Sequence, residues 1–421
     1  MPSFPQLNQD IKTDVLIIGG GMAGLLTAYY LTQSGVDCVV AEKESICCNT
    51  TANTTAKITL QHGLSYDKIF KSQGFDVTQA YYKANLQALQ EYENLCKSIN
   101  CDYEKKDNFV YSLKDTKALE NETRTLQKIG CNADIVNNLP LPIKTAGAIR
   151  VRNQAQFHPL KFVAEIVPKL KIYENTFIKK IALNTAVTDT EKITFKKAVV
   201  TTHFPFINNH GTFFMKLYQH RSYVIALENA PDVNGMYVDE SHTGLSFRNY
   251  NNLLLLGGGG HRTGKNGGNW EELRDFRRIN YPQARETAYW AAQDCMSLDS
   301  IPYIGKYFKN SDTLYVASGF NKWGMSGSMV SAMLLRDIIT EKENPYAFAF
   351  NPQRNMLKPQ LFINGFESAV NLVTPTTKRC PHLGCALKWN NAEHSWDCPC
   401  HGSRFSENGK LLDNPANNNL Q

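Results

Sequence analysis

Near its amino end, the chain alternates apolar runs with a helical pattern in the order that a parallel sheet requires. The run 14–18 is short and rich in β-branched side chains, as expected for a buried strand. Apolar residues then recur at helical spacing from Leu25 to Leu31, and Gly35 is expected to end this helix. The run 38–41 predicts a second buried strand. The pattern therefore indicates a strand–helix–strand unit of an α/β fold.

A glycine-rich turn joins the first strand to the helix. Gly19, Gly21 and Gly24 fit the G-x-G-x-x-G pattern, and Glu42 follows the second strand, 18 residues beyond Gly24. Such glycines allow a tight turn, the approach of a pyrophosphate and close helix–strand packing, while the acid accepts hydrogen bonds from a ribose. The turn predicts a site for FAD or NAD rather than NADP, with an ordinary strand–turn–helix unit as the alternative.

A second strand, glycine turn and helix follow near residue 320. Residues 313–317 predict the strand and residues 318–327 the turn. This unit resembles the late flavin-contacting motif of the D-amino-acid-oxidase-like (DAO) flavoproteins, and residues 299–305 resemble the segment that precedes it. Residues 54–59 resemble the family stretch that crosses the flavin face. The resemblance covers most of residues 14–345, in the right order, and implies non-covalently bound FAD.

The same resemblance implies the cofactor contacts and the domain organisation. Besides the glycines and the acid of the first turn, the implied flavin contacts are Thr55, Ala56, Gly319, Trp323, Gly324 and Met325. A Rossmann-like FAD domain of the glutathione-reductase type is expected to comprise residues 1–85, 148–215 and 295–345. An α+β substrate domain is expected at residues 86–147 and 216–294. The sequence holds no second complete G-x-G-x-x-G with its acid, which weighs against a reductase with separate FAD and NAD(P)H domains.

Polar residues in the stretches expected near the flavin are candidates for catalysis. Lys57 and His62 lie in such a stretch, where a catalytic and a structural role are both open. Arg221, Arg248 and Arg262 could each bind a substrate carboxylate through a bidentate fork, or else form a surface or inter-domain ion pair. We take Lys57, His62 and Arg248 as the catalytic candidates.

Two cysteine–histidine pairs stand close together near the carboxyl end. Cys380 and His382 form the first pair, and Cys398 and His401 form the second. Two thiolates and two imidazoles suit a Rieske [2Fe–2S] centre, in which the thiolates hold one iron and the imidazoles the other. A zinc site is the alternative, because zinc accepts the same four ligands.

Further residues favour the Rieske interpretation. The two loops resemble those of respiratory-type Rieske proteins, which carry a disulfide at the positions of Cys385 and Cys400 and match residues 414–416 as well. A zinc site needs none of these. The resemblance implies that Cys385 and Cys400 form a bridge and that the ligands are Cys380, His382, Cys398 and His401.

The carboxyl-terminal segment departs from that pattern in two ways. Phe405 stands where respiratory Rieske proteins have a tyrosine that hydrogen-bonds a ligand sulfur. Hydrogen bonds to sulfur tune the potential, so we expect a value below the top of the Rieske range. Only a short segment with several prolines separates Asn344 from Cys380. Residues 346–421 are therefore expected to form a linker and a minimal all-β cluster subdomain packed on the flavoprotein body.

Composition and charge exclude some classes of partner and location. The 421 residues suggest two to three domains, and 45 basic against 39 acidic residues without a dense basic block give no case for nucleic acid. Residues 1–14 lack the apolar region of a secretory signal, and the uncharged run 15–36 holds too many glycines and polar residues for a transmembrane segment. Seven of the eleven cysteines are scattered, which fits a reducing compartment, so we expect a cytoplasmic protein.

Together these features predict an FAD-dependent dehydrogenase acting on the C–N bond of an amine or amino acid. Electrons would pass from flavin to the cluster one at a time, and then to an external acceptor protein or quinone. The rival hypothesis is an electron-transfer or redox-sensing protein without an organic substrate. A Rieske oxygenase would need a mononuclear iron held by two histidines and a carboxylate, and no compact motif of that kind stands out in the sequence.

Overall fold

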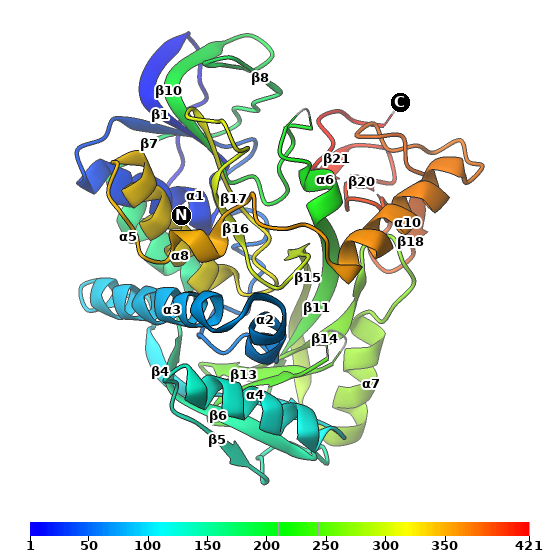
Figure 1. Cartoon of the computed structure of the whole chain (residues 1–421). Coiled ribbons are helices and arrows are strands. Elements are labelled where there is room, and N and C mark those ends of the chain that lie inside the picture. The colour runs from blue at the N-terminus through cyan, green and yellow to red at the C-terminus, as the bar shows by residue number, and fades with distance from the viewer. Residues whose placement is uncertain (209, 242–243, 421) are drawn as a thin grey trace.

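Three sheets organise the chain (Figure 1). The computed structural model describes residues 1–208, 210–241 and 244–420. Within these residues the sheets have eight, nine and four strands, and the four-stranded one lies at the carboxyl end. The predicted fold class is confirmed: the protein is a mixed α/β molecule with a separate, small all-β sheet.

The eight-stranded sheet carries the glycine-rich turn. Its path runs β16–β17–β10–β1–β2–β7, with β9 beside β10 and β8 beside β9, and β1 pairs in parallel with both β2 and β10. A parallel strand covered on both faces needs apolar side chains throughout, which explains the β-branched run in β1. The strands are β1 (Ile11–Ile18), β2 (Cys38–Ala41), β7 (Lys171–Tyr173), β8 (Lys180–Ala182), β9 (Thr185–Val187), β10 (Lys192–Val200), β16 (Tyr303–Lys306) and β17 (Leu314–Ser318).

Helices bring the two glycine turns of this sheet together. α1 (Met22–Gln33) follows the first turn and α8 (Gly324–Ile339) follows the second, and the two helices pack side by side in one apolar core. α5 (Pro159–Ile166) and the short 3-10 helix η1 (Val167–Lys169) pack against α1. The two glycine turns, which lie far apart in the sequence, are thus brought close together in the fold.

The nine-stranded sheet forms the lower half of the molecule in Figure 1. Its path runs β15–β11–β14–β13–β12–β4–β6–β3, with β5 beside β6. β3 and β6 come from segments that we assigned to the flavin domain, and the domain division stays a prediction. The strands are β3 (Lys57–Ile58), β4 (Glu104–Ser112), β5 (Ala133–Val136), β6 (Gly147–Gln156), β11 (Leu217–Glu228), β12 (Met236–Asp239), β13 (Ser246–Tyr250), β14 (Leu253–Arg262) and β15 (Arg285–Ser297).

Four helices accompany this second sheet. α7 packs on β11 and β14, α4 packs on β5 and β6, and α3 contacts α8 of the first layer. Glu122 of α4 accepts hydrogen bonds from the backbone N–H groups of Tyr66 and Asp67, at 2.9 and 2.7 Å, and so holds the start of α2. The helices are α2 (Ser65–Gln73), α3 (Phe75–Cys96), α4 (Thr116–Lys128) and α7 (Trp270–Asn280).

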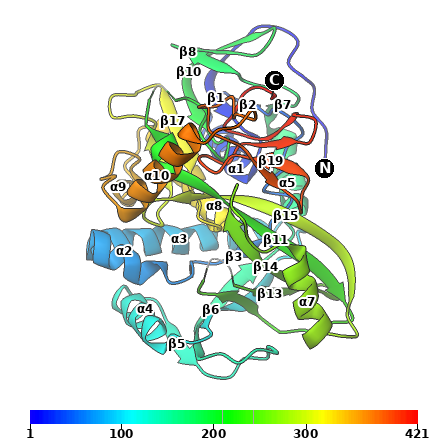
Figure 2. The same ribbon diagram turned by 90° about the vertical axis from the view of Figure 1, so that its right-hand side faces the viewer.

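The four-stranded sheet packs on the body of the molecule, as Figures 1 and 2 show in red. Asn414 and Gln293 help to hold it: Gln293 Nε2 donates to the carbonyl of Gly402 at 2.8 Å. We find no helix among the described residues whose length and apolar character would let it span a bilayer. The strands of this sheet are β18 (Lys388–Asn390), β19 (Ser395–Asp397), β20 (Arg404–Ser406) and β21 (Leu411–Asp413). The helices not yet described are α6 (Phe213–Lys216), directly before β11, and α9 (Ala347–Phe350) and α10 (Pro359–Val373), which precede the sheet.

Candidate redox site

A cavity of about 400 Å³ is lined by residues of all three sheets. This volume lies within the range of about 300–1,000 Å³ that is usual for small-molecule sites. Gly24, Ala56 and Gly319 are not part of the wall but adjoin it along the chain. The predicted cofactor residues in the wall are Gly19, Gly21, Glu42, Thr55, Trp323, Gly324 and Met325.

Two positions of the first glycine turn, Gly19 and Gly24, have room for glycine only. Gly19 has a φ of +111°, and a Cβ atom there would meet the carbonyl oxygen of Thr201 at 2.8 Å. A Cβ atom on Gly24 would strike the carbonyl oxygen of Gly19. Helix α1 begins in the cavity wall; its N-cap residue is Gly21, which has no side chain, and the N–H of Met22 donates to the Thr51 hydroxyl at 3.1 Å. Such a cradle fits the pyrophosphate of a dinucleotide.

Glu42 lies at the end of β2, in the same wall. Its Oε2 accepts a hydrogen bond from the backbone N–H of Gly20 at 2.6 Å, and its Oε1 accepts one from Glu44 at 2.9 Å. Burial raises the pKa of Glu42, while these two hydrogen bonds lower it. The carboxylate therefore braces the glycine turn at the place where a ribose is expected.

His62 and Trp323 connect the early loop with the second glycine turn. Their rings stack with centroids 5.0 Å apart. His62 Nδ1 lies 2.6 Å from the Tyr81 hydroxyl, and Nε2 lies 2.9 Å from both the Thr59 carbonyl and the Ser326 hydroxyl. Burial lowers the pKa of His62 to about 3, so the ring is neutral at physiological pH. With both nitrogens engaged, His62 is suited to positioning this loop rather than to exchanging protons.

Lys57 and Arg248 bring two positive charges close together beside the cavity. Lys57 lies in the cavity wall, and its Nζ donates to the Thr55 hydroxyl at 3.0 Å. Arg248 is buried: its Nη1 donates to the Ala56 carbonyl at 3.4 Å, and its Nε has no hydrogen-bond partner among the described residues. Burial, assisted by the Arg248 charge, lowers the pKa of Lys57 to about 7, and burial lowers that of Arg248 to about 10. Two adjacent cations suit an anionic ligand.

The other two candidate arginines contact the cluster subdomain. Arg221 Nε donates to Glu393 Oε1 at 3.0 Å, and its Nη2 pairs with Oε2 of the same carboxylate. Arg262 Nε donates to the Pro399 carbonyl at 3.2 Å. Arg221 thus forms an inter-domain ion pair, whereas Arg262 contacts the cluster subdomain through uncharged groups, so Arg248 remains the arginine candidate for substrate.

The four predicted cluster ligands converge at the two carboxyl-terminal loops. The rings of His382 and His401 lie with centroids 4.9 Å apart, and the thiols of Cys380 and Cys398 hydrogen-bond to each other. Nδ1 of each histidine is buried without a hydrogen-bond partner in the described part of the chain. Burial lowers the pKa of His382 to about 4 and that of His401 to about 3, so both imidazoles are neutral. Neutral imidazoles with orphaned nitrogens beside two thiols fit a [2Fe–2S] centre.

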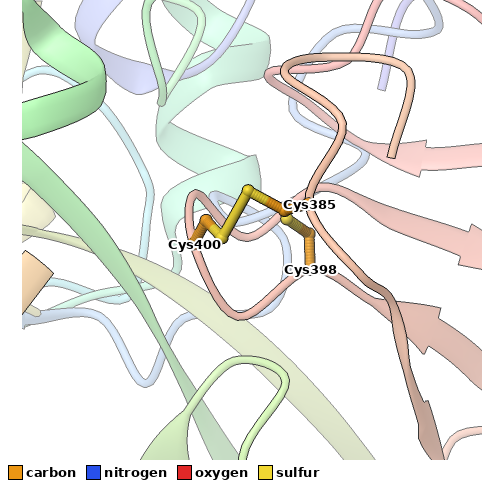
Figure 3. A group of neighbouring side chains, drawn as sticks. All are labelled: Cys385, Cys398 and Cys400. Atoms are coloured by element: carbon orange, nitrogen blue, oxygen red, sulfur yellow. A yellow bond between two sulfur atoms is a disulfide. The ribbon is translucent and has the colours of Figure 1, made fainter. Parts of the chain in front are cut away.

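A disulfide lies beside these ligands (Figure 3). It joins Cys385 to Cys400, whose Cα atoms are 6.7 Å apart, and their sulfur atoms lie within 4.8 Å of that of Cys398. The bridge therefore ties the two cluster loops together next to a predicted ligand. Ser403 offers a hydroxyl to the Cys380 thiol, whereas the fully buried Phe405 offers none.

Sequence reasoning missed the loop that joins the cavity to the cluster. Residues 201–203 line the cavity, and Phe204 follows directly. The Phe204 ring lies with its centroid 6.5 Å from that of His382 and 6.1 Å from that of His401. Asn414 Nδ2 donates to two carbonyl groups of this loop, at 2.6 Å each. Asn414 was noticed only as part of the Rieske pattern, and the loop itself has no sequence signature.

The site and the fold define a flavoprotein with a fused iron–sulfur domain, and the family comparisons agree. The model of the FAD dependent oxidoreductase family (DAO) matches residues 14–338, and that of the Rieske [2Fe-2S] domain matches residues 368–421. The chain therefore belongs to the FAD-dependent oxidoreductases of the DAO family and carries a Rieske domain at its carboxyl end. Its cofactors are FAD and a [2Fe–2S] cluster.

Relatives resemble the chain along its whole length or in one part. The Rieske 2Fe-2S iron-sulfur protein YhfW of Bacillus subtilis (strain 168) is 33% identical over 99% of this chain and 94% of its own length. The cytochrome b6-f complex iron-sulfur subunit of Synechococcus sp. (strain JA-3-3Ab) is 48% identical over 42 residues, which are 10% of this chain and 24% of that protein.

Solved structures share the fold of the body. Glycine oxidase from Geobacillus kaustophilus superposes with a TM-score of 0.68 at 17% identity, covering 82% of this chain and 99% of that one. L-proline dehydrogenase from P. horikoshii gives 0.68 at 16% identity, covering 83% and 98%. At such identities the likeness concerns the fold alone.

Proposed function

We propose that this chain oxidises a C–N bond of an amine or amino acid and delivers the electrons through its cluster to an external acceptor protein or quinone. When bound, FAD would supply the group that takes a hydride from the substrate carbon, and the cluster would supply one-electron transfer. The observation that carries the proposal is the single cavity whose wall combines the glycine turn, the nine-stranded sheet and residues 411–414 of the cluster subdomain.

The cofactor roles proposed for individual residues follow from this wall. Gly19, Gly21 and Gly24 leave space for the pyrophosphate, and Glu42 takes the ribose. Around the second turn, Gly319, Gly324 and Met325 shape the backbone near the isoalloxazine, and Trp323 is held by its stack on His62. Thr55 adds to this wall, and Ala56 adjoins it along the chain. Each of these assignments is part of the proposal.

The substrate is proposed to carry a negative charge, such as the carboxylate of an amino acid. The buried Arg248 retains an unpartnered Nε, and Lys57 places a second cation beside it. Because the pKa of Lys57 is about 7, its amine is partly deprotonated near neutral pH and can accept a proton at Nζ. Arg248 thus serves as the anion ligand and Lys57 as a candidate proton acceptor.

The contact between the body and the cluster loops supports electron transfer within one chain. The loop 201–203 borders the cavity, and Phe204 touches both predicted histidine ligands. Asn414 fixes that loop from the cluster side. Cys380, His382, Cys398 and His401 would hold the two irons, with neutral imidazoles on the side that packs against Phe204.

An anaerobic screen of amines and amino acids with the purified holoprotein tests this function. Bleaching of the flavin absorbance followed by the EPR signal of a reduced Rieske cluster is the expected result. Bleaching of the flavin without any later EPR signal from the cluster would contradict electron transfer through the cluster.

The alternative is a flavin–Rieske relay between protein partners without an organic substrate. The close contact between cavity and cluster serves such a relay equally well. Its expected result in the same screen is no bleaching by any compound, although reduced protein partners still reduce the flavin.

A further inference from the structure

Helix α10 presents its apolar side chains to solvent and its polar ones to the protein. Phe362 and Phe366 are each 69% exposed and Val373 is 79% exposed, whereas Asn364 and Asn371 are each 3% exposed. A surface helix normally has the opposite arrangement, with the apolar stripe toward the core. Figure 1 places α10 at the outer edge of the molecule, beside the cluster strands.

Hydrogen bonds fix this orientation. The Asn364 side chain accepts from Arg262 Nη1 at 3.0 Å and donates to the Met215 carbonyl at 3.2 Å. At the other end of α10, the Asn371 carbonyl accepts from the backbone N–H of Ala386, next to the disulfide, at 2.8 Å. Rotating the helix to bury its apolar side would break these contacts, so the exposure is built into the fold.

The apolar surface continues onto the first cluster loop. Leu383, which follows the predicted ligand His382, is 40% exposed, and the intervening chain is tied to α10 by Arg379, whose Nη1 donates to the Leu372 and Gly384 carbonyls at 3.1 and 2.8 Å. A contiguous exposed apolar surface of this kind marks an interaction site. We define the α10 face as Phe362, Ile363, Phe366, Val370, Val373 and Leu383.

The chain segment that carries the α10 face holds almost only positive charges. Residues 355–392 contain a single acid, Glu367, which pairs with Lys265 at 2.7 Å. No ion pair within the described residues involves the four basic groups of the segment, which are Lys358, Lys378, Arg379 and Lys388. The occupant of this face is therefore expected to be both apolar and anionic.

We propose that the α10 face docks on an anionic membrane surface, with α10 lying in the plane of the interface. Aromatic and branched side chains on one side, flanked by lysine and arginine, are the composition of helices that bury their apolar face at the boundary between headgroups and acyl chains. The flanking lysines then lie at the level of the lipid phosphates, where anionic lipids attract them.

Other occupants fit less well. In a symmetric dimer the same patch faces itself, so the basic groups of both copies would meet and repel each other. Transient electron-transfer partners usually make small contacts, whereas this face offers a row of large apolar side chains. A membrane meets both the apolar and the charge requirement.

Docking in this way turns the His382 loop toward the bilayer. If the cluster passes electrons on, as the proposed function states, this orientation favours a lipid-dissolved quinone as the electron acceptor. This consequence rests on the proposed function. The quinone takes two electrons, one at a time from the cluster, and two protons from water, and becomes a quinol.

Vesicle co-sedimentation tests the docking without any substrate. The holoprotein is mixed with vesicles of phosphatidylcholine alone or with an equal share of phosphatidylglycerol. We expect binding to the anionic vesicles only, and weaker binding when salt rises from about 0.1 to about 1 M and the screening length falls from about 10 to about 3 Å. The double variant Phe362→Gln/Phe366→Gln should bind at least about tenfold more weakly.

A matched control separates this effect from a general loss of exposed apolar surface. Ile279→Gln removes a side chain that is 79% exposed on α7, away from α10, and should bind vesicles like the parent protein. Equal binding of all variants, or no binding of the parent, would overturn the proposal. A parent protein that is dimeric by light scattering and becomes monomeric in the double variant would instead identify a second copy as the occupant. Because no turnover is measured, failure here leaves the proposed oxidation untouched.

Discussion

The cavity and the cluster subdomain differ in whether their buried charged side chains have partners of opposite charge. In the cluster subdomain, the buried Arg404 reaches three carboxylates: Nε bonds Asp397 at 3.0 Å, Nη1 bonds Asp413 at 3.1 Å, and Nη2 bonds Glu393 at 2.8 Å. Beside the cavity, Lys57 and Arg248 form no ion pair with any described residue. A buried charge without a partner costs stability unless a ligand compensates for it.

This difference separates a structural network from a binding site. The carboxylates around Arg404 connect β19, β20 and β21, and Glu393 extends the network to Arg221 of the body. Their charges are satisfied before any ligand arrives. Lys57 and Arg248 have no such partner among the described residues, and the proposed function assigns the compensating charge to an anionic substrate.

Cys398→Ser should abolish the cluster while leaving the cavity intact. Removing one thiolate leaves one iron of the [2Fe–2S] unit with a single protein ligand instead of two, so iron content and the Rieske EPR signal should be lost. FAD content and flavin absorbance should stay as in the parent. Cys96→Ser, which alters a half-buried cysteine outside both the cluster loops and the cavity wall, is the control and should retain both cofactors. Retention of iron by the Cys398 variant would refute the ligand assignment.

Arg404→Met should destabilise the cluster subdomain strongly. It leaves the buried Asp397 and Asp413 without their cation and Glu393 with Arg221 alone, which costs on the order of 3–5 kcal/mol in the free energy of unfolding. Urea unfolding followed by fluorescence measures this loss. The control Arg285→Met breaks an exposed pair with Glu228 and should leave the unfolding midpoint unchanged. Similar midpoints for the two variants would contradict the proposed difference between the two regions.

The same network predicts a sensitivity to acid. Burial alone would raise the pKa of Glu393 and Asp413, but the arginines outweigh burial and hold both pKa values below their usual range. Their stabilisation is therefore present above the unfolded pKa values of about 4 and is lost as pH falls through the lower folded values. Unfolding between neutral and acidic pH should show this loss in the parent and a smaller one in Arg404→Met.

Lys57→Met should remove a pH dependence from the reductive half-reaction. If Lys57 accepts the substrate proton, flavin reduction should accelerate as pH rises through about 7, where the amine becomes deprotonated. The variant should be slower and lack this rise. Lys68→Met changes another lysine of the cavity wall and should keep the parent profile. A rise that persists in Lys57→Met would assign the proton transfer to another group.

Phe405→Tyr should produce the smallest effect, on the potential of the cluster. A new hydroxyl near a ligand sulfur would raise the midpoint by roughly 20–60 mV, if it contributes about 0.5–1.5 kcal/mol to a one-electron couple. Redox titration followed by EPR measures the shift. Phe348→Tyr, at an exposed position outside the cluster subdomain, should leave the midpoint unchanged. A parent midpoint near the top of the Rieske range would contradict the expectation drawn from Phe405.

The features that the sequence predicted share one property: their signals are local. The turn around Gly19 and the pairs at Cys380 and Cys398 each occupy a few consecutive residues, so the spacing of those residues was enough to indicate their chemistry. Contacts between distant segments have no such local signal, so the sequence did not predict them. Nothing near Arg221 indicates that Glu393, 172 residues away, would take its charge. Local periodicity also gave no sign that the apolar side of α10 would face solvent, because that depends on what surrounds the helix.

The loop from residue 201 to Phe204 makes the iron–sulfur part inseparable from the rest. Its backbone carbonyls are held by Asn414, and part of the cavity wall comes from residues 411–414. Removing the last seventy-odd residues would therefore open the cavity and uncover Phe204, which is now fully buried. Exchange of the carboxyl-terminal unit for another electron carrier would therefore require a new wall for the cavity as well.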